Sequence, residues 1–190
     1  MRRRTVTEKP WRKVERCIPE KYGRYRYLLE IQISAEPGPR LAALLKNPSA
    51  ASRERSDPTV GKLEAWARRR GFASVSVINL FAWRTPHPRA LNGLPFRKIA
   101  GPGNDRHILA AVAGADLAVA GWGNPNGIDP GVYERRIGEV RELLRPYPLQ
   151  AVGPPTKDGH PRHALLWNGD VETAPFGFRE RPAPTAAARR

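Results

Sequence analysis

Polar side chains that could do chemistry gather in four short segments, each of which follows an apolar run. The segments are residues 46–51, 79–88, 122–126 and 156–163. Their unusual polar residues are Asn47, Ser49, Asn79, Arg84, His87, Asn124, Asn126, Lys157, His160 and His163. Amides, imidazoles and basic groups outnumber carboxylates in this set. The segments therefore favour a ligand that is electron-rich, hydrogen-bonding or anionic.

Several common enzyme motifs do not fit these segments. The Gly-Trp-Gly at residues 121–123 lacks the third glycine of a dinucleotide fingerprint, and its Trp stands where close approach is needed. Ser49 lies outside any G-x-S-x-G elbow and is typical of a turn. His160 and His163, with Asp158 nearby, have metal-ligand types, but the intervening proline argues against a helix that aligns both imidazoles. We expect neither a metal nor another cofactor.

The surrounding pattern alternates between strands and helices. Predicted strands cover residues 25–33, 41–45, 75–81, 117–122 and 149–152. Predicted helices cover residues 58–70, 105–115 and 130–145. Asp57 and Asp129 each precede a proline and read as N-caps, and Asn104 is predicted to cap the middle helix.

This order predicts an α/β fold with three αβα layers, built on a central, mostly parallel four-stranded sheet with an additional N-terminal strand. In such folds the ligand binds outside the carboxyl ends of the strands. The four polar segments are therefore expected to meet at one edge of the sheet.

Charge is concentrated at the two ends of the chain. The 190 residues carry a formal charge of +15. Residues 1–26 hold ten basic and three acidic side chains, and residues 179–190 hold four and one. We predict a single domain over residues 21–178, a basic arm over residues 1–20 and a flexible basic tail over residues 179–190. A polyanion, most simply nucleic acid, is the expected partner, and a merely solubilising surface is the alternative.

Cysteine content and hydropathy exclude other classes. A single cysteine, Cys17, forms no intrachain disulfide and no four-cysteine cluster. No apolar run approaches the ~20 residues of a membrane span. We therefore expect no membrane association and a soluble cytoplasmic protein.

Six short motifs together resemble a bacterial and phage family of unknown function. They are residues 45–49 (LKNPS), 57–59 (DPT), 79–84 (NLFAWR), 103–105 (GND), 121–123 (GWG) and 156–163 (TKDGHPRH). The resemblance covers residues 22–167. That family in turn resembles a divergent branch of the uracil-DNA glycosylase superfamily.

Three positions carry the resemblance to glycosylases. Asn47, followed by a proline, resembles the first motif of the superfamily, although Leu45 replaces its usual glycine. Asn79 and Arg84 reproduce the spacing of an Asn-x-x-x-x-Arg-x-Pro motif, and His163 resembles the His of a His-Pro-Ser motif whose other two residues are lost. The resemblance implies that Asn47 holds the attacking water and that His163 stabilises the departing base.

The other implied roles concern base and phosphate recognition. The implied base-binding residues are Asn79, Ser49, Trp83 and Trp122. The implied DNA-phosphate contacts are Arg84, Lys157, Arg162 and Lys46. The alternatives are a turn role for Asn47 and core positions for the two tryptophans.

The resulting hypothesis is a monofunctional, metal-free DNA glycosylase that extrudes a modified or damaged base and leaves an abasic site. Its DNA would be duplex with a flipped base or single-stranded. The family's spread extends the hypothesis to hypermodified phage bases and antiviral defence. The alternatives are a non-catalytic nucleic-acid-binding module, a hydrolase of small nucleosides, and an added Schiff-base lyase step at Lys46 or Lys157.

Overall fold

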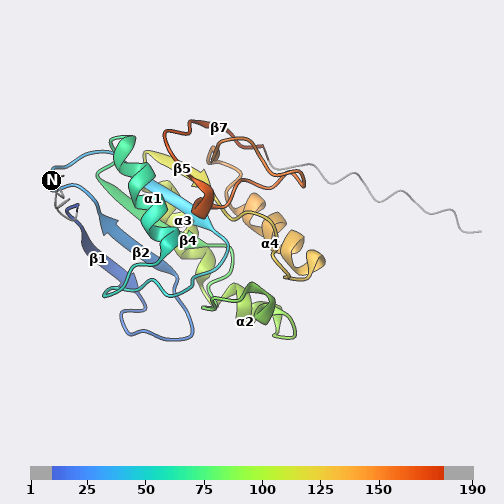
Figure 1. Cartoon of the computed structure of the whole chain (residues 1–190). Coiled ribbons are helices and arrows are strands. Elements are labelled where there is room, and N and C mark those ends of the chain that lie inside the picture. Colours follow the sequence, from blue (N-terminus) through green and yellow to red (C-terminus); the bar gives the residue numbers. More distant parts are fainter. Residues whose placement is uncertain (1–9, 178–190) are drawn as a thin grey trace, which may run out of the picture.

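The computed structural model describes residues 10–177 and forms one mixed sheet with helices on both faces (Figure 1). Its strands are β1 Lys13–Ile18, β2 Leu28–Gln32, β3 Arg40–Leu45, β4 Ser74–Asn79, β5 Leu117–Ala120, β6 Gln150–Val152 and β7 Thr173–Pro175. They are arranged in the order β1-β2-β4-β3-β5-β6-β7. The predicted domain end at residue 178 and the predicted tail lie outside the described residues.

The four-stranded parallel core predicted from the sequence is confirmed. Strands β4, β3, β5 and β6 are mutually parallel, and β3 lies between β4 and β5. The five residues after Arg40 in β3 are all buried. Such an unbroken apolar strand is typical of a parallel strand that is covered on both faces.

The edges of the sheet are antiparallel and extend it beyond the expected strands. β2, the predicted N-terminal strand, pairs with β4 on one side and with β1 on the other. β1 lies inside the predicted basic arm, so residues 13–18 of that arm belong to the sheet, and residues 1–9 lie outside the described part. β7 pairs with β6 at the opposite edge. β1 was not expected because only Cys17 among its six residues is buried, and a charged, short strand is typical of a protected edge.

Helices cover the sheet on both faces and confirm the three layers. Helix α1 (Pro58–Arg69) packs on one face with the buried Trp66, beside the short turn η2 (Ala164–Leu166). Helices α3 (Asn104–Ala113) and α4 (Pro130–Leu143) pack on the other face with Ile108 and Val140. A 3₁₀ turn η1 (Pro88–Leu91) and the five-residue helix α2 (Phe96–Ala100) follow β4 and were not predicted.

Two of the three predicted helix caps are confirmed and one is wrong. Oδ1 of Asp57 accepts from the Val60 amide, and Oδ1 of Asp129 accepts from the amide three residues on. Asn104 does not cap α3, because the N-cap is Gly103, with φ +76, and Asn104 is the first helical residue. Its side-chain amide instead donates to backbone carbonyls at the end of β4. No helix within residues 10–177 is long and apolar enough to cross a membrane.

Candidate functional site

A cavity of about 210 Å³ opens at the carboxyl ends of β3 and β4. It is lined by Arg26, Leu45, Lys46, Asn47, Ser49, Asp57, Thr59, Val60, Thr85, Pro86, Pro88, Asn126 and His163. All four polar segments predicted from the sequence contribute at least one residue to it, which confirms that they meet at one edge of the sheet. Four of the ten predicted site residues line the cavity, namely Lys46, Asn47, Ser49 and His163.

Asn47 is held by its amide group. Its Nδ2 donates to the backbone oxygens of Thr85, at 2.7 Å, and Pro48, at 3.1 Å. Both amide protons are therefore engaged by carbonyl groups. This fixes the side chain so that Oδ1 is its remaining group, an acceptor for a donor that enters the cavity.

His163 is a neutral imidazole with a defined proton. Its Nδ1 accepts from the Leu165 amide at 3.2 Å, so the neutral ring carries its proton on Nε2. Burial and, to a smaller extent, the nearby charge of Lys46 lower the pKa of His163 to about 4, while Asp57 acts in the opposite direction. His163 is therefore a hydrogen-bond donor that stays uncharged at neutral pH.

A glycine lets the loop after β5 approach this histidine. Gly123 has φ +68, and a Cβ at this position would lie 2.7 Å from the Cβ of His163. The amide of Gly123 also donates to the Pro161 carbonyl at 3.0 Å. A larger residue would push His163 out of place, so the Gly-Trp-Gly motif has a packing role here.

Lys46 is buried beside these groups. Its relative exposure is 2%, and its Nζ lies 6.0 Å from the ring centroid of Tyr133. Among residues 10–177 no carboxylate forms an ion pair with it. Burial lowers the pKa of Lys46 to about 8. The sequence predicted a phosphate contact for Lys46, whereas the structure places the amine in the wall of the cavity.

Two arginines shape the loop that carries Asn47 and Ser49. Arg26 is 2% exposed and donates to the carbonyl of Ala51 at 3.0 Å and to Oδ1 of Asn79 at 3.1 Å. Arg84 donates to the carbonyls of Ser49, at 2.9 Å, and Ala51, at 2.8 Å. The sequence predicted a phosphate contact for Arg84; in the structure its Nη1 holds this loop and its Nε donates to the Gly23 carbonyl at 3.2 Å.

The remaining predicted residues do not line the cavity. Asn79 is fully buried and accepts from Arg26, and Trp122 is 1% exposed with its ring against Phe176. Trp83 is half-buried beside Tyr25. The predicted phosphate contacts at positions 157 and 162 are exposed on the loop that leads to His163.

Sequence reasoning missed several residues of the cavity wall. Arg26 appeared only as part of a strand, and Asp57 only as a cap. Asp57 is indeed the cap of α1, but its Oδ2 also accepts from the Ala51 amide at 3.2 Å and its carboxylate lines the cavity. Asn126 was named among the polar residues of segment 122–126 but was given no role, and it lines the wall with a positive φ of 54°. The N-terminus of α1, a region of positive potential, faces the same space through Thr59.

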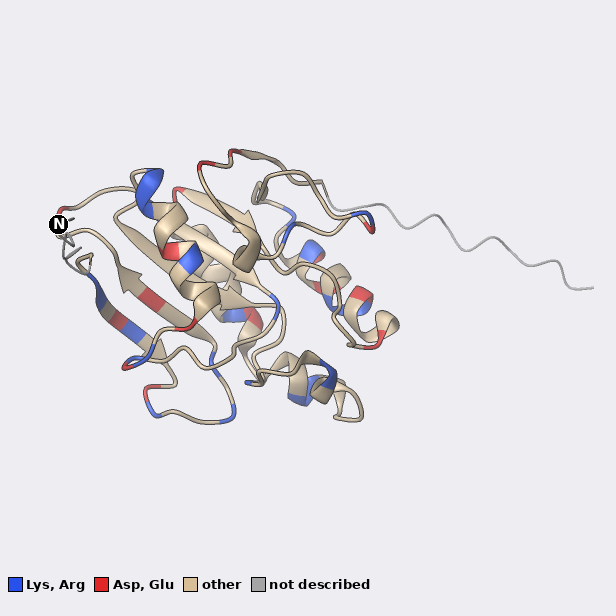
Figure 2. Cartoon of the chain, viewed as in Figure 1, with Lys and Arg blue, Asp and Glu red and all other residues tan. Residues whose placement is uncertain are grey.

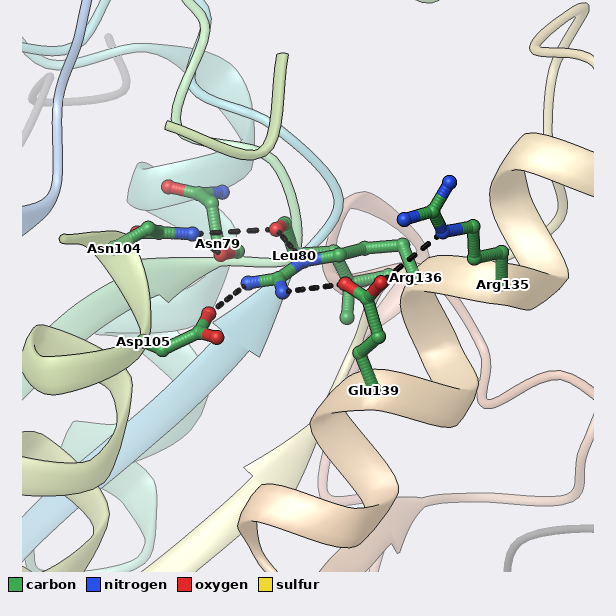
Figure 3. A network of polar contacts seen from close by, with 7 residues as sticks. All are labelled: Asn79, Leu80, Asn104, Asp105, Arg135, Arg136 and Glu139. Carbon is green, nitrogen blue, oxygen red and sulfur yellow. Dashed lines mark hydrogen bonds and ion pairs between the residues drawn. The ribbon is translucent and has the colours of Figure 1, made fainter. Parts of the chain in front are cut away.

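A second polar network fixes the end of β4 (Figure 3). Arg136 is 1% exposed, and its Nε donates to the Leu80 carbonyl at 2.6 Å. Its other nitrogens bind Asp105 at 2.5 Å and Glu139 at 3.3 Å. Asn104 donates to the carbonyls of residue 79, at 3.0 Å, and Leu80, at 3.2 Å. This network anchors the segment from which the Thr85 carbonyl reaches Asn47.

A basic and aromatic surface adjoins the cavity. The loop between β1 and β2 and helix α2 lie at the lower edge of the molecule, and both carry basic positions (Figure 2). Tyr22 is 65% exposed, with the Arg84 guanidinium 4.3 Å from its ring centroid. Arg24 lies 5.2 Å from the ring centroid of Trp83. Arg84 belongs both to this surface and to the loop beside the cavity.

The histidines expected as weak metal candidates are separated in role. His160 lies 3.5 Å from a carboxylate oxygen of Glu134 and contacts the ring of Tyr133, whereas His163 faces the cavity. Within the described residues no group of three or more His, Cys, Asp or Glu side chains is placed to hold a metal ion.

Comparisons with known proteins give a family but no described relative. A search of curated proteins and a search of solved structures each found no match. One family model matches residues 26–165, a range that begins at Arg26 and extends two residues beyond His163, and so includes the whole cavity wall. The chain therefore belongs to the family described as "Protein of unknown function (DUF1643)".

Proposed function

We propose that the protein is a DNA glycosylase, which hydrolyses the N-glycosidic bond of a modified or damaged base and leaves an abasic site. The observation that carries this proposal is one small cavity in which an oriented acceptor, Asn47, and a neutral donor, His163, lie together. The likeness of the family to the uracil-DNA glycosylases is part of the proposal.

The two groups match the two demands of this reaction. Water must be oriented toward C1′ of the sugar while negative charge grows on the departing base. Oδ1 of Asn47 would accept a hydrogen bond from the water. Nε2–H of His163 would donate to the base, and a neutral donor of this kind stabilises the anion without transferring a proton.

The electrostatics of the wall support the same assignment. The buried guanidinium of Arg26 and the N-terminus of α1 favour a leaving anion. Asp57 is the one carboxylate among the described residues that line the cavity, and it would stabilise positive charge on the sugar. The cavity is smaller than the ~300–1,000 Å³ of pockets for drug-sized ligands, which suits a single extruded base.

The basic and aromatic surface beside the cavity supports DNA as the polymer. Guanidinium groups contact phosphates, and exposed rings such as Tyr22 stack on unpaired bases. The same surface favours the second candidate function, a nucleic-acid-binding module without catalysis. Binding of either kind is expected to weaken as salt rises.

Alkaline strand cleavage tests the proposal. DNA with normal, deaminated or hypermodified bases, including bases of phage type, is incubated with the wild type, Asn47→Ala and the exposed control Asn168→Ala. Cleavage at one class of base that is lost only in Asn47→Ala supports the proposal. DNA retention without abasic sites would favour the binding module, and release of base from free nucleosides would favour a nucleoside hydrolase.

A further inference from the structure

Lys46 is a buried amine that has no role in the proposed hydrolysis of the N-glycosidic bond. Its side chain is 2% exposed, and it shares the cavity wall with Asn47 and His163. No carboxylate among residues 10–177 forms an ion pair with its Nζ, which lies over the ring of Tyr133. An ammonium in such a place is costly because burial removes most of its hydration and no carboxylate of the described residues pairs with it.

We propose that the protein also cleaves the DNA strand at the abasic site, with Lys46 as the amine that forms a Schiff base with the sugar aldehyde. This inference rests on the proposed function for DNA as the polymer in the cavity. It does not depend on which base is released. Of the two lysines considered from the sequence, Lys157 is exposed on a loop and does not line the cavity.

The reaction balances without an oxidant or a reductant. The Nζ lone pair attacks C1′ of the ring-opened aldehyde, and the resulting carbinolamine loses water to give an iminium ion. A proton leaves C2′, its electron pair forms the C2′=C3′ bond, and the C3′–O bond breaks with departure of the phosphate. Water then hydrolyses the imine and restores the amine. Asp57 lines the same cavity and is an acceptor for the C2′ proton.

The local environment keeps this amine available as a nucleophile. Burial lowers the pKa of Lys46 from the ordinary 10.5 to about 8. At pH 8 about half of such an amine is unprotonated, against roughly 0.3% of an ordinary lysine. Attack by an exposed lysine would therefore be much slower at the same pH.

Borohydride trapping tests the inference directly. The full chain is incubated with duplex DNA that carries one preformed aldehydic abasic site, in the presence of sodium borohydride, and the linked peptide is identified by mass spectrometry. The adduct is expected on Lys46. Lys46→Met and Lys46→Arg should lose the cross-link, and Lys13→Met, which removes an exposed amine on β1, should keep it. If Lys46 contributes only its positive charge, Lys46→Arg should retain that role, and no cross-link should form with the wild type or with any variant.

The outcomes separate this inference from the proposed function. An adduct on Lys46 without release of any base in the glycosylase panel supports the lyase step and contradicts the glycosylase. Base release without an adduct, or with an adduct on another amine, overturns the lyase step and leaves the glycosylase intact. The mapping uses the wild-type chain, so it decides the matter even if a Lys46 variant fails to fold.

Discussion

Two buried cations on the carboxyl side of the sheet have opposite surroundings: one has carboxylate partners and the other has none among the described residues. Arg136 is 1% exposed and meets a carbonyl and two carboxylates. Lys46 is 2% exposed and has no carboxylate partner among the described residues. A buried guanidinium whose donors all have acceptors stabilises one arrangement of the backbone. Burial of an amine that has no carboxylate partner instead lowers the pKa of the amine and makes it more reactive.

The two sites are nevertheless connected. Arg136 and Asn104 hold the carbonyls at the end of β4 (Figure 3). The chain that follows carries Thr85, whose carbonyl fixes the amide of Asn47. The Arg136 network thus helps to position Asn47 without lining the cavity itself. The reactive groups are held in place by the backbone that this network fixes.

The largest effect on stability is expected from Arg136→Met. It removes the shorter of the two hydrogen bonds to the Leu80 carbonyl and the ion-pair partner of Asp105, while Glu139 keeps its ion pair with Arg135. Because the guanidinium is buried, we expect a loss of about 3 kcal/mol in the free energy of unfolding. Urea denaturation measures it. The neighbouring Arg135 has an exposed side chain and one ion pair at 3.1 Å, and Arg135→Met should cost only about 0.5 kcal/mol. Equal losses in both variants would show that the burial of Arg136 has no special role.

How much of this arrangement could be predicted depends on where the signal lies. The parallel core was predictable because strands such as β3 are unbroken apolar runs, and the ligand edge followed from the fold. β1 was missed because its charged residues face solvent and only Cys17 is buried. β7 has three residues and ends in a proline, which leaves no periodicity to detect.

The candidate site divides in the same way. Lys46 and Asn47 follow β3 directly, and His163 lies at the end of the loop after β6, so their meeting at the carboxyl edge of the sheet was predictable from the topology. Asn79 was expected to bind the base because it follows a predicted strand and resembles a family motif, but its side chain at the end of β4 is buried and accepts a hydrogen bond from Arg26. Arg26 itself reaches the cavity through tertiary contacts 25 and 53 residues away in sequence, which no local pattern encodes.

The next largest effect should be the pH dependence that His163 gives to stability. Its pKa is about 4 in the folded chain, below its ordinary 6.5. Between these values the unfolded chain binds the extra proton, so wild-type stability falls as the pH drops from 6.5 toward 4. We expect His163→Gln to remove about 1–2 kcal/mol of this loss.

Urea denaturation at pH 7 and pH 4.5 measures the difference, with His87→Gln as an exposed control. The control should show the same change in the free energy of unfolding between the two pH values as the wild type. If His163→Gln shows this change as well, His163 is not a neutral donor enclosed by the cavity, and its proposed contact with the departing base loses its basis.

The smallest effect is expected from Lys46→Met, and it has the opposite sign to that of Arg136→Met. Methionine is unbranched and apolar, so replacing an unpaired buried ammonium should stabilise the chain by about 1 kcal/mol at pH 7. The pKa of Lys46 is about 8 when folded, below the ordinary 10.5. Over this range the unfolded chain binds the extra proton, so wild-type stability rises with pH and the advantage of the variant shrinks.

Urea denaturation at pH 7 and pH 9.5 follows this change, with Lys13→Met as the exposed control. A loss of stability in Lys46→Met at pH 7 would mean that the ammonium has a partner that compensates its burial, as Arg136 has. The contrast between the two cations would then disappear. A gain that shrinks at pH 9.5 would instead show that the fold tolerates a destabilising amine in this cavity, which is the pattern expected when a residue is kept for chemistry.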